Sequence, residues 1–219
     1  MPSYKLQTWI DFCKKFRIRE YGVPLFRTHD GIAAISKVGR GPGRIFLQRS
    51  KQMDKLIVAE VRKVIRDHTE KKDRYEGLIY LMYKVRGDLV IPLYVGRSEK
   101  YSHRSGKISP NINKIEQNQH KFCQWGYGYT YHIGDLSAVV CEGHPEGKKT
   151  LKYKRWAENL FKKYPTSAPK LKSPVYFWIK AWKKGETGIW REYGSTSLNF
   201  LEHLIIGVAS DLFPQRILK

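Results

Sequence analysis

The sequence predicts an α+β fold in which a small mixed or antiparallel sheet is flanked by helices. Apolar residues recur at helical spacing over residues 4–16, 50–69 and 197–212. Between the second and third of these segments lie two short apolar runs, separated by a turn sequence centred on Gly87. With 219 residues and 41% hydrophobic content, the chain is long enough to bury a substantial core.

The first 75 residues are predicted to form an N-terminal extension of helix and loop. After its first helix, glycine and proline break residues 17–49 into short strands and loops. Ser50 is placed as the N-cap of the second helix. The nearly uniform polarity of residues 70–76 then marks the boundary with a core over residues 76–219.

The two apolar runs, 78–85 and 89–95, are predicted to form a β-hairpin. By the two-residue period of a strand, Tyr80 and Lys84 share one face of the first strand. Tyr94 lies at the end of the second strand, just before a glycine that lets the chain turn closely. The hairpin therefore brings two phenols within reach of one ligand.

The segments that follow the hairpin carry weaker patterns. Residues 98–119 are polar, and we expect a helical turn or two around Arg104 with a break near Pro110. Alternating aromatic residues followed by an apolar run predict a third strand over residues 125–140.

The last part of the chain is predicted to alternate between helix and strand. A basic amphipathic helix is expected at 151–161, a strand at 174–182, a loop or hairpin at 185–194, and a final helix at 197–212. A serine or threonine within 195–197 is the expected N-cap of that last helix.

The charge balance points to a polyanionic partner. The chain carries 41 Lys and Arg against 20 Asp and Glu, a formal net charge of +21, which is more than solubility alone requires. Nucleic acid is the first candidate, because each neutralised phosphate releases counterions, and anionic membrane is the second. No apolar run approaches the roughly 20 residues of a membrane-spanning helix. We expect nucleic acid as the partner, and no membrane.

Cysteine usage favours a reduced, cytoplasmic setting. Cys13, Cys123 and Cys141 are an odd number at wide spacing, without a CxxC pair, so neither a disulfide framework nor a zinc knuckle is indicated. The charged N-terminal residues do not form a signal peptide.

The hairpin residues resemble a known family. Gly77-Leu78-Ile79-Tyr80 is followed by Leu93-Tyr94-Val95-Gly96 and then by Arg104, an order that resembles the GIY-YIG nucleases. The resemblance implies that the two tyrosines lie on the first two strands of the sheet and the arginine on the helix that follows. It also implies that one glutamate on a later helix binds Mg²⁺ (or Mn²⁺). Glu202, in the final helix, is the residue that matches.

The resemblance gives each of these residues a role in phosphodiester hydrolysis. Tyr80 would activate the attacking water, and Tyr94 would orient the water or the phosphate. Arg104 would hold phosphate oxygens in a bidentate grip. A phenol has a pKa of about 10, so it can act as a base only if cations lower that value. Lys84 is the predicted local cation.

Three positions depart from the family pattern. Gly77 stands one residue earlier than the family glycine. The family often has a histidine one turn after its arginine; this chain has an isoleucine there, and His103 or Lys107 is the candidate replacement. Gln215 is the nearest amide to the family's asparagine.

Basic clusters outside the hairpin predict the DNA-binding surface. The resemblance leaves an insertion over about 141–194, which carries much of this charge. The candidate DNA-binding residues are Arg40, Arg44, Arg97, Lys107, Lys149, Lys152 and Arg155.

Together these observations predict a metal-dependent endonuclease acting on double-stranded DNA. The lack of a separable recognition module resembles sequence-specific type II restriction enzymes, with a homing or repair nuclease as the alternative within the class. A basic nucleic-acid-binding protein that lost the activity is the alternative outside it. RNA remains open as a substrate, because charge does not distinguish the two polymers. A homodimer would supply the second active site needed to cut both strands.

Overall fold

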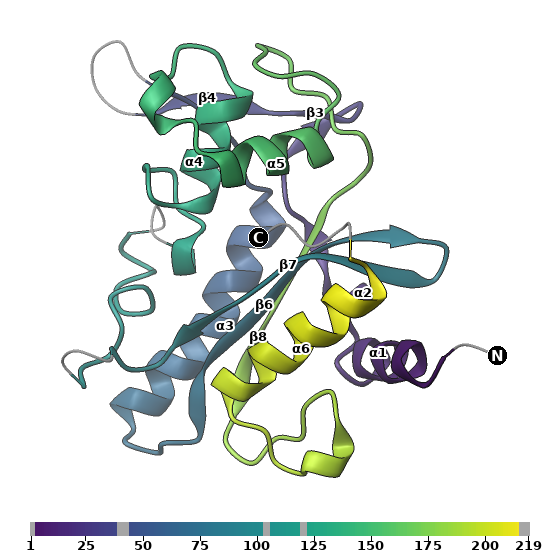
Figure 1. The fold of residues 1–219 in the computed structure, drawn as a ribbon. Coiled ribbons are helices and arrows are strands. Elements are labelled where there is room, and N and C mark those ends of the chain that lie inside the picture. Colours follow the sequence, from purple (N-terminus) through teal and green to yellow (C-terminus); the bar gives the residue numbers. More distant parts are fainter. Residues whose placement is uncertain (1–2, 39–43, 103–105, 119–121, 215–219) are drawn as a thin grey trace.

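A four-stranded antiparallel sheet forms the centre of the protein (Figure 1). The computed structural model describes residues 3–38, 44–102, 106–118 and 122–214. The strands of the sheet lie in the order β1-β8-β6-β7, with bounds β1 Val23–Pro24, β8 Tyr176–Lys183, β6 Tyr75–Arg86 and β7 Leu89–Glu99. The predicted α+β fold, the hairpin and the strand at 174–182 are confirmed.

The hairpin formed by β6 and β7 has a register that matters for the site. Tyr80 pairs with Gly96 and Met82 pairs with Tyr94, so both tyrosines point to the same face of the sheet. The turn between the strands contains Gly87 at φ +59°. Since β7 has a partner on one side only, it is the edge strand on which the candidate site is built.

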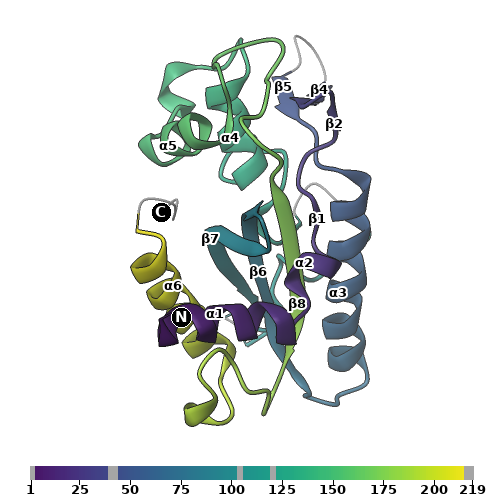
Figure 2. The same ribbon diagram turned by 90° about the vertical axis from the view of Figure 1, so that its right-hand side faces the viewer.

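Helices cover both faces of the sheet (Figure 2). On one face lie α3 (Lys51–Thr69), α4 (His132–Val140) and α5 (Leu151–Leu160). On the other lie α1 (Tyr4–Lys15) and α6 (Leu198–Leu212). Each face buries its own cluster of apolar side chains. The predicted helices at 4–16, 50–69, 151–161 and 197–212 are confirmed.

Serine hydroxyls begin three of these helices. Ser50 accepts a hydrogen bond from the Met53 N–H at 2.9 Å, as the sequence predicted. Ser197 caps α6 in the same way, and Ser3 caps α1.

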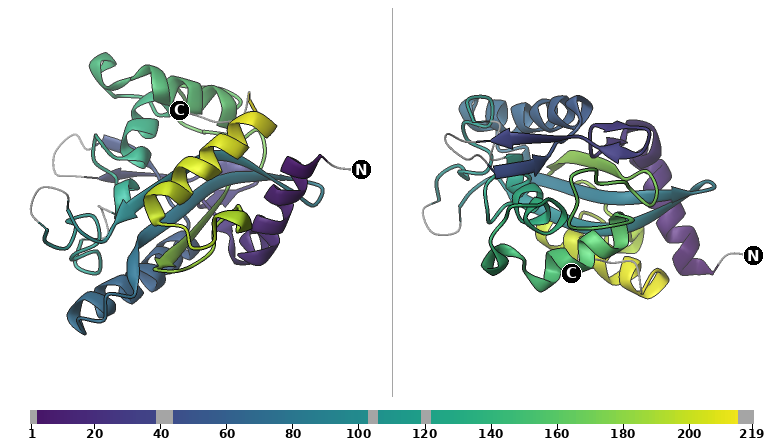
Figure 3. Two further views of the ribbon diagram at one scale, coloured as in Figure 1. Left: turned by 60° about the horizontal axis from the view of Figure 1, so that its bottom comes forward. Right: turned by 90° about the horizontal axis from the view of Figure 1, so that it is seen from above.

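Shorter elements complete the fold (Figure 3). They are α2 (Ile18–Tyr21), the paired strands β2 (Thr28–His29) and β3 (Ile32–Ala33), the paired strands β4 (Ile35–Val38) and β5 (Arg44–Leu47), and 3-10 turns at Phe122–Gln124, Glu146–Lys148 and Arg191–Tyr193. Two of these pairs lie in the region 17–49, where short strands and loops were predicted.

The N-terminal extension packs with the core throughout. Trp9 and Phe12 of α1 lie in the same apolar cluster as Ile79 of β6. Met53 and Val61 of α3 share the opposite cluster with the hairpin. Residues before and after position 75 therefore contribute to both apolar clusters.

The predicted third strand over 125–140 is wrong. Its second half forms α4, whose residues are buried on nearly every side of the helix. A helix surrounded by protein has no polar stripe, so its sequence reads as a continuous apolar run like that of a buried strand. The helical turns expected near Arg104 cannot be compared, because residues 103–105 lie outside the described part of the chain.

Within the described residues, the structure contains no helix with both the length and the apolar character needed to cross a bilayer.

A buried ion pair joins α3 to the hairpin. The ammonium of Lys100, at the end of β7, lies 2.8 Å from the carboxylate of Asp67, and the two side chains are 1% and 0% exposed. Asp67 also accepts hydrogen bonds from the N–H groups of Arg74 and Tyr75, where β6 begins. Burial would raise the pKa of Asp67, but these donors outweigh it and hold the pKa well below its ordinary range.

Asp67→Asn would leave the Lys100 ammonium buried without its carboxylate. We expect it to lower the free energy of unfolding by about 3–5 kcal/mol. Because the pKa of Asp67 is lowered in the folded protein, its contribution is complete above the ordinary carboxyl pKa and is lost as the pH falls through the folded-state value. Urea unfolding at neutral and acidic pH measures both effects.

Asp73→Asn is the control, since Asp73 is an exposed carboxylate that also contacts Lys100. It should destabilise the protein far less. Equal losses in the two variants would contradict the importance of the buried pair.

Candidate active site

Two tyrosines from neighbouring strands form the centre of the candidate site. The rings of Tyr80 and Tyr94 lie side by side with centroids 6.4 Å apart. A Cβ atom on Gly96 would lie 2.5 Å from the Tyr80 ring, so only glycine leaves room for this ring over β7. The predicted meeting of the two phenols is confirmed.

The Tyr80 side chain is buried, with only 2% of the residue exposed. Its hydroxyl donates to the backbone carbonyl of Arg97 at 3.4 Å. Burial, followed by the negative charges of neighbouring groups that include Glu202, raises the pKa of Tyr80 well above its ordinary value. In this state the phenol is a protonated hydrogen-bond donor.

Lys84 points elsewhere. Its ammonium donates to the backbone carbonyl of Asn159 in α5 at 3.1 Å. The described structure therefore ties the predicted local cation to α5.

Tyr94 lies in a cluster of aromatic rings. Its ring centroid is 4.9 Å from that of His132 and 5.1 Å from that of Trp156. Trp125 contacts both Tyr80 and Tyr94 edge on. Burial, with a smaller contribution from the charge of Glu202, raises the pKa of Tyr94 to about 12.

Glu202 lies on α6 and contacts the edge strand. Its carboxylate pairs with the guanidinium of Arg97, which also donates to Glu99 at 3.1 Å. The Glu202 side chain is 16% exposed, and all three charged groups are partly buried. Arg97, a predicted DNA-binding residue, is held here between two carboxylates.

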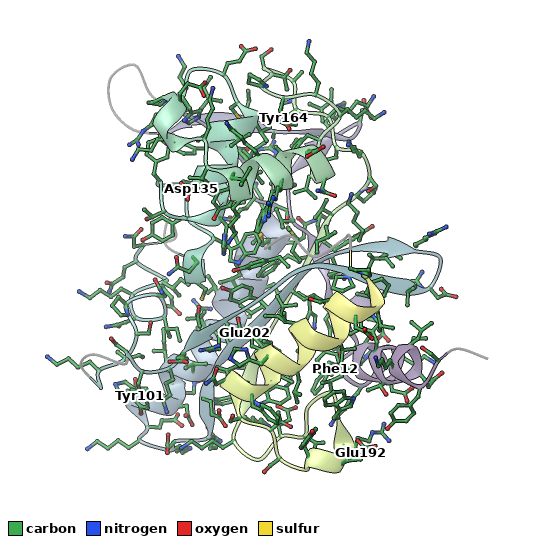
Figure 4. All side chains as sticks on the ribbon, in the orientation of Figure 1. Phe12, Tyr101, Asp135, Tyr164, Glu192 and Glu202 are labelled. Carbon is green, nitrogen blue, oxygen red and sulfur yellow. The ribbon has the colours of Figure 1, made fainter. Side chains whose placement is uncertain are left out.

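The phenols and the carboxylates approach β7 from opposite faces. The register places Tyr94 and Gly96 on the face of Tyr80, whereas Arg97 alternates to the face covered by α6. The two groups meet at Arg97. The Tyr80 hydroxyl donates to the Arg97 carbonyl, and the Glu202 carboxylate accepts from the Arg97 side chain. The charge of Glu202 still acts on both phenols. Figure 4 shows Glu202 on α6 beside the hairpin.

An open cavity of about 520 Å³ lies at this edge. Glu202, Arg97 and Glu99 form one wall of it. Residues of β7, of the loop after it and of the Phe122–Gln124 turn form the rest of the lining: Ser98, Tyr101, Ser102, Ser109, Pro110, Asn111 and Gln124. The cavity gives solvent and ligands access to both carboxylates.

The donor set fits magnesium. Among the described residues, no three His, Cys, Asp or Glu side chains gather as a metal cage. Glu99 and Glu202 nevertheless face one shared cation, the guanidinium of Arg97, beside an open cavity. Mg²⁺ commonly binds through one or two carboxylates and keeps several waters, so this pair has the chemistry that Mg²⁺ or Mn²⁺ requires.

Lys152 of α5 lies over Tyr94. Its ammonium is 4.9 Å from the Tyr94 ring centroid and 5.5 Å from that of Trp156. Burial lowers the pKa of Lys152, and the carboxylate of Asp135 offsets this in part. Burial and this ammonium lower the pKa of His132 to about 3, so His132 is neutral and forms a hydrogen bond with the Tyr153 hydroxyl.

Three other predicted DNA-binding residues, Arg44, Lys149 and Arg155, lie on the side of the sheet that carries α5. Arg44 at the start of β5 stacks on the Tyr129 ring at 4.7 Å, and Lys148 lies over the same ring at 5.1 Å. Lys149 pairs with Glu146. Arg155 is exposed on α5, and Lys107 is exposed in the loop after β7.

Four predicted site residues lie outside the described part of the chain: Arg40, His103, Arg104 and Gln215.

Sequence reasoning missed Glu99 and the aromatic neighbours of Tyr94. Glu99 could have been found, because it lies two residues after Arg97 and shares its strand face. Trp125, His132 and Trp156 come from segments far along the chain, and their local patterns predict only burial.

Comparisons of the chain with protein-family models, with curated proteins and with solved structures find no match. The resemblance to the GIY-YIG nucleases therefore stays a prediction that rests on the motifs and on the geometry above.

Gly96→Ala would place a methyl group inside the contact distance of the Tyr80 ring. We expect the ring to shift and the free energy of unfolding to fall by about 1–3 kcal/mol. Urea unfolding measures this. Gly147→Ala is the matched control, because a Cβ there meets no atom within 4 Å. A Gly96→Ala protein as stable as the Gly147→Ala protein would show that the ring does not depend on this glycine.

Proposed function

We propose that this protein is a metal-dependent endonuclease that hydrolyses phosphodiester bonds in double-stranded DNA. One observation carries the proposal. Tyr80 and Tyr94 stand side by side on a hairpin whose edge strand also contacts the carboxylate of Glu202, and Glu202, on the opposite face of that strand, lines an open cavity. A pair of phenols and a magnesium-type carboxylate at one strand edge is a combination suited to phosphate chemistry.

Glu202, together with Glu99, would hold the metal ion. Bound magnesium supplies positive charge that stabilises the transition state and the leaving oxygen. For these carboxylates to become available, Arg97 must leave them. A phosphate of the DNA is a suitable new partner for its guanidinium, in keeping with the DNA-binding role predicted for Arg97.

The tyrosines act first as hydrogen-bond donors. The raised pKa values of Tyr80 and Tyr94 keep both phenols protonated, so their hydroxyls can donate to a phosphate oxygen or orient a water molecule. Tyr80 becomes a general base only when positive charge near its hydroxyl lowers that pKa. Lys152, which belongs to the inserted segment, places its ammonium over the Tyr94 ring and is a candidate for this charge.

The substrate is proposed from the charge. A net charge of +21, with Arg44, Lys152 and Arg155 on the side of the sheet that carries α5, favours a long polyanion. We propose that the protein cuts duplex DNA at specific sequences. We further propose that it acts as a homodimer in a cytoplasmic setting.

A second candidate function is DNA binding without catalysis. It is favoured by two properties of the same site. The Tyr80 phenol is only 2% exposed, and Glu202 is neutralised by Arg97. A protein of this kind would keep the basic surface and the hairpin as a scaffold.

Glu202→Gln separates the two functions. If Glu202 binds the catalytic ion, the variant should cleave mixed-sequence duplex DNA at least about a hundredfold more slowly than the parent in magnesium. Its affinity for DNA in chelator should be unchanged or higher, because a negative charge is removed. Single-turnover cleavage and a mobility-shift titration measure the two quantities.

Glu158→Gln is the control, since Glu158 is an exposed carboxylate on α5. It should cut at the parent rate. A parent protein that binds duplex DNA but produces no magnesium-dependent fragments would refute the nuclease and support the second candidate.

A further inference from the structure

The cavity beside Glu202 continues past the end of β7. A second cavity of about 390 Å³ adjoins it, and Glu99, Tyr101 and Ser102 line both. Tyr101 therefore lies between two cavities. Glu99 lines both of them, and Glu202 lines the first. In Figure 4 the labelled Tyr101 lies beyond the end of β7, with Glu202 on the neighbouring α6.

Tyr101 presents a fixed aromatic surface. The residue is 40% exposed. The His68 ring meets it edge on at 5.8 Å, and the ammonium of Lys100 lies 5.0 Å from its centroid. Since the buried Asp67 holds Lys100, the ring rests on a rigid support.

Two carboxamides share this cavity. Asn111 and Gln124 are half-buried in its wall, and their side-chain amides make no hydrogen bond within the described residues. The Sγ atom of Cys123 donates to the Asn111 backbone carbonyl at 3.6 Å, which connects the two segments. Gln124 has φ +78°, a conformation that a side-chain-bearing residue seldom adopts and that is often found at ligand sites.

We propose that this cavity receives a nucleobase flipped out of the bound duplex and stacked on Tyr101, with its edge read by the amides of Asn111 and Gln124. Every base has a flat face that stacks on a tyrosine ring, and carboxamides pair with base edges through one donor and one acceptor. The proposal rests on the proposed function for its DNA substrate. It adds the element of base recognition that a sequence-specific enzyme needs.

Affinity for duplex DNA, measured in chelator over a range of salt concentrations, tests the stacking contact without requiring cleavage. Tyr101→Ala should weaken binding by about tenfold or more, and Tyr101→Phe should bind like the parent. The dependence of affinity on salt should be the same in all three proteins, because no phosphate contact is lost. Circular dichroism confirms that each variant is folded.

Tyr193→Ala is the matched control. Tyr193 is a more exposed tyrosine, 57% accessible, and it follows Glu192, which Figure 4 shows well away from Tyr101. This variant should bind like the parent. A Tyr101→Ala protein that binds as tightly as Tyr193→Ala would overturn the proposal.

Base reading is tested by selecting bound molecules from a random-sequence duplex pool and sequencing them. The parent should enrich particular bases, and Asn111→Ala and Gln124→Ala should each relax the preference at one position. An unchanged preference in both variants would overturn the assignment of these amides.

The two proposals fail in different ways. A protein that binds DNA through Tyr101 but shows no magnesium-dependent cleavage would leave the base site standing and remove the nuclease. A protein that cleaves DNA, and whose DNA affinity is unchanged by Tyr101→Ala, would support the nuclease and refute the base site.

Discussion

The structure depends on the contact between the Tyr80 ring and the bare backbone of Gly96. Because no side chain occupies that position, the ring lies flat against the edge strand and its hydroxyl reaches the Arg97 carbonyl. The next residue along the strand points to the opposite face, where its guanidinium meets Glu202 of α6. A single position on β7 thus connects an aromatic cluster on one face with a cluster of charges on the other.

Both clusters consist of groups that are costly to bury without partners. The phenols stay protonated because burial and nearby negative charge raise their pKa values. The carboxylates of Glu99 and Glu202 pair with the guanidinium of Arg97. A phosphate would offer the Arg97 guanidinium a new partner, and a divalent cation would offer one to the two carboxylates. This exchange is the physical reason for placing phosphate chemistry at this edge.

The sequence predicted much of the fold, because its helices carry one polar face and its hairpin alternates around a clear turn. The helix at 151–161 was recognised from its amphipathic spacing, whereas α4 was taken for a strand because its residues are buried almost all round. The closeness of the Tyr80 and Tyr94 side chains followed from the predicted hairpin and the two-residue period of its strands. The contact of Arg97 with Glu202 and the exposed position of Tyr101 could not be predicted in the same way, since they depend on how α6 and the loop after β7 are packed against the edge strand.

The most direct test of the central claim is the single-turnover rate at which Tyr80→Phe cleaves duplex DNA in magnesium. Phenylalanine keeps the ring over Gly96 and removes only the hydroxyl, so the fold and the DNA affinity should be preserved. Our account predicts magnesium-dependent fragments with the parent protein and a loss of cleavage of at least about a hundredfold in the variant. Cleavage at the parent rate by Tyr80→Phe would contradict it.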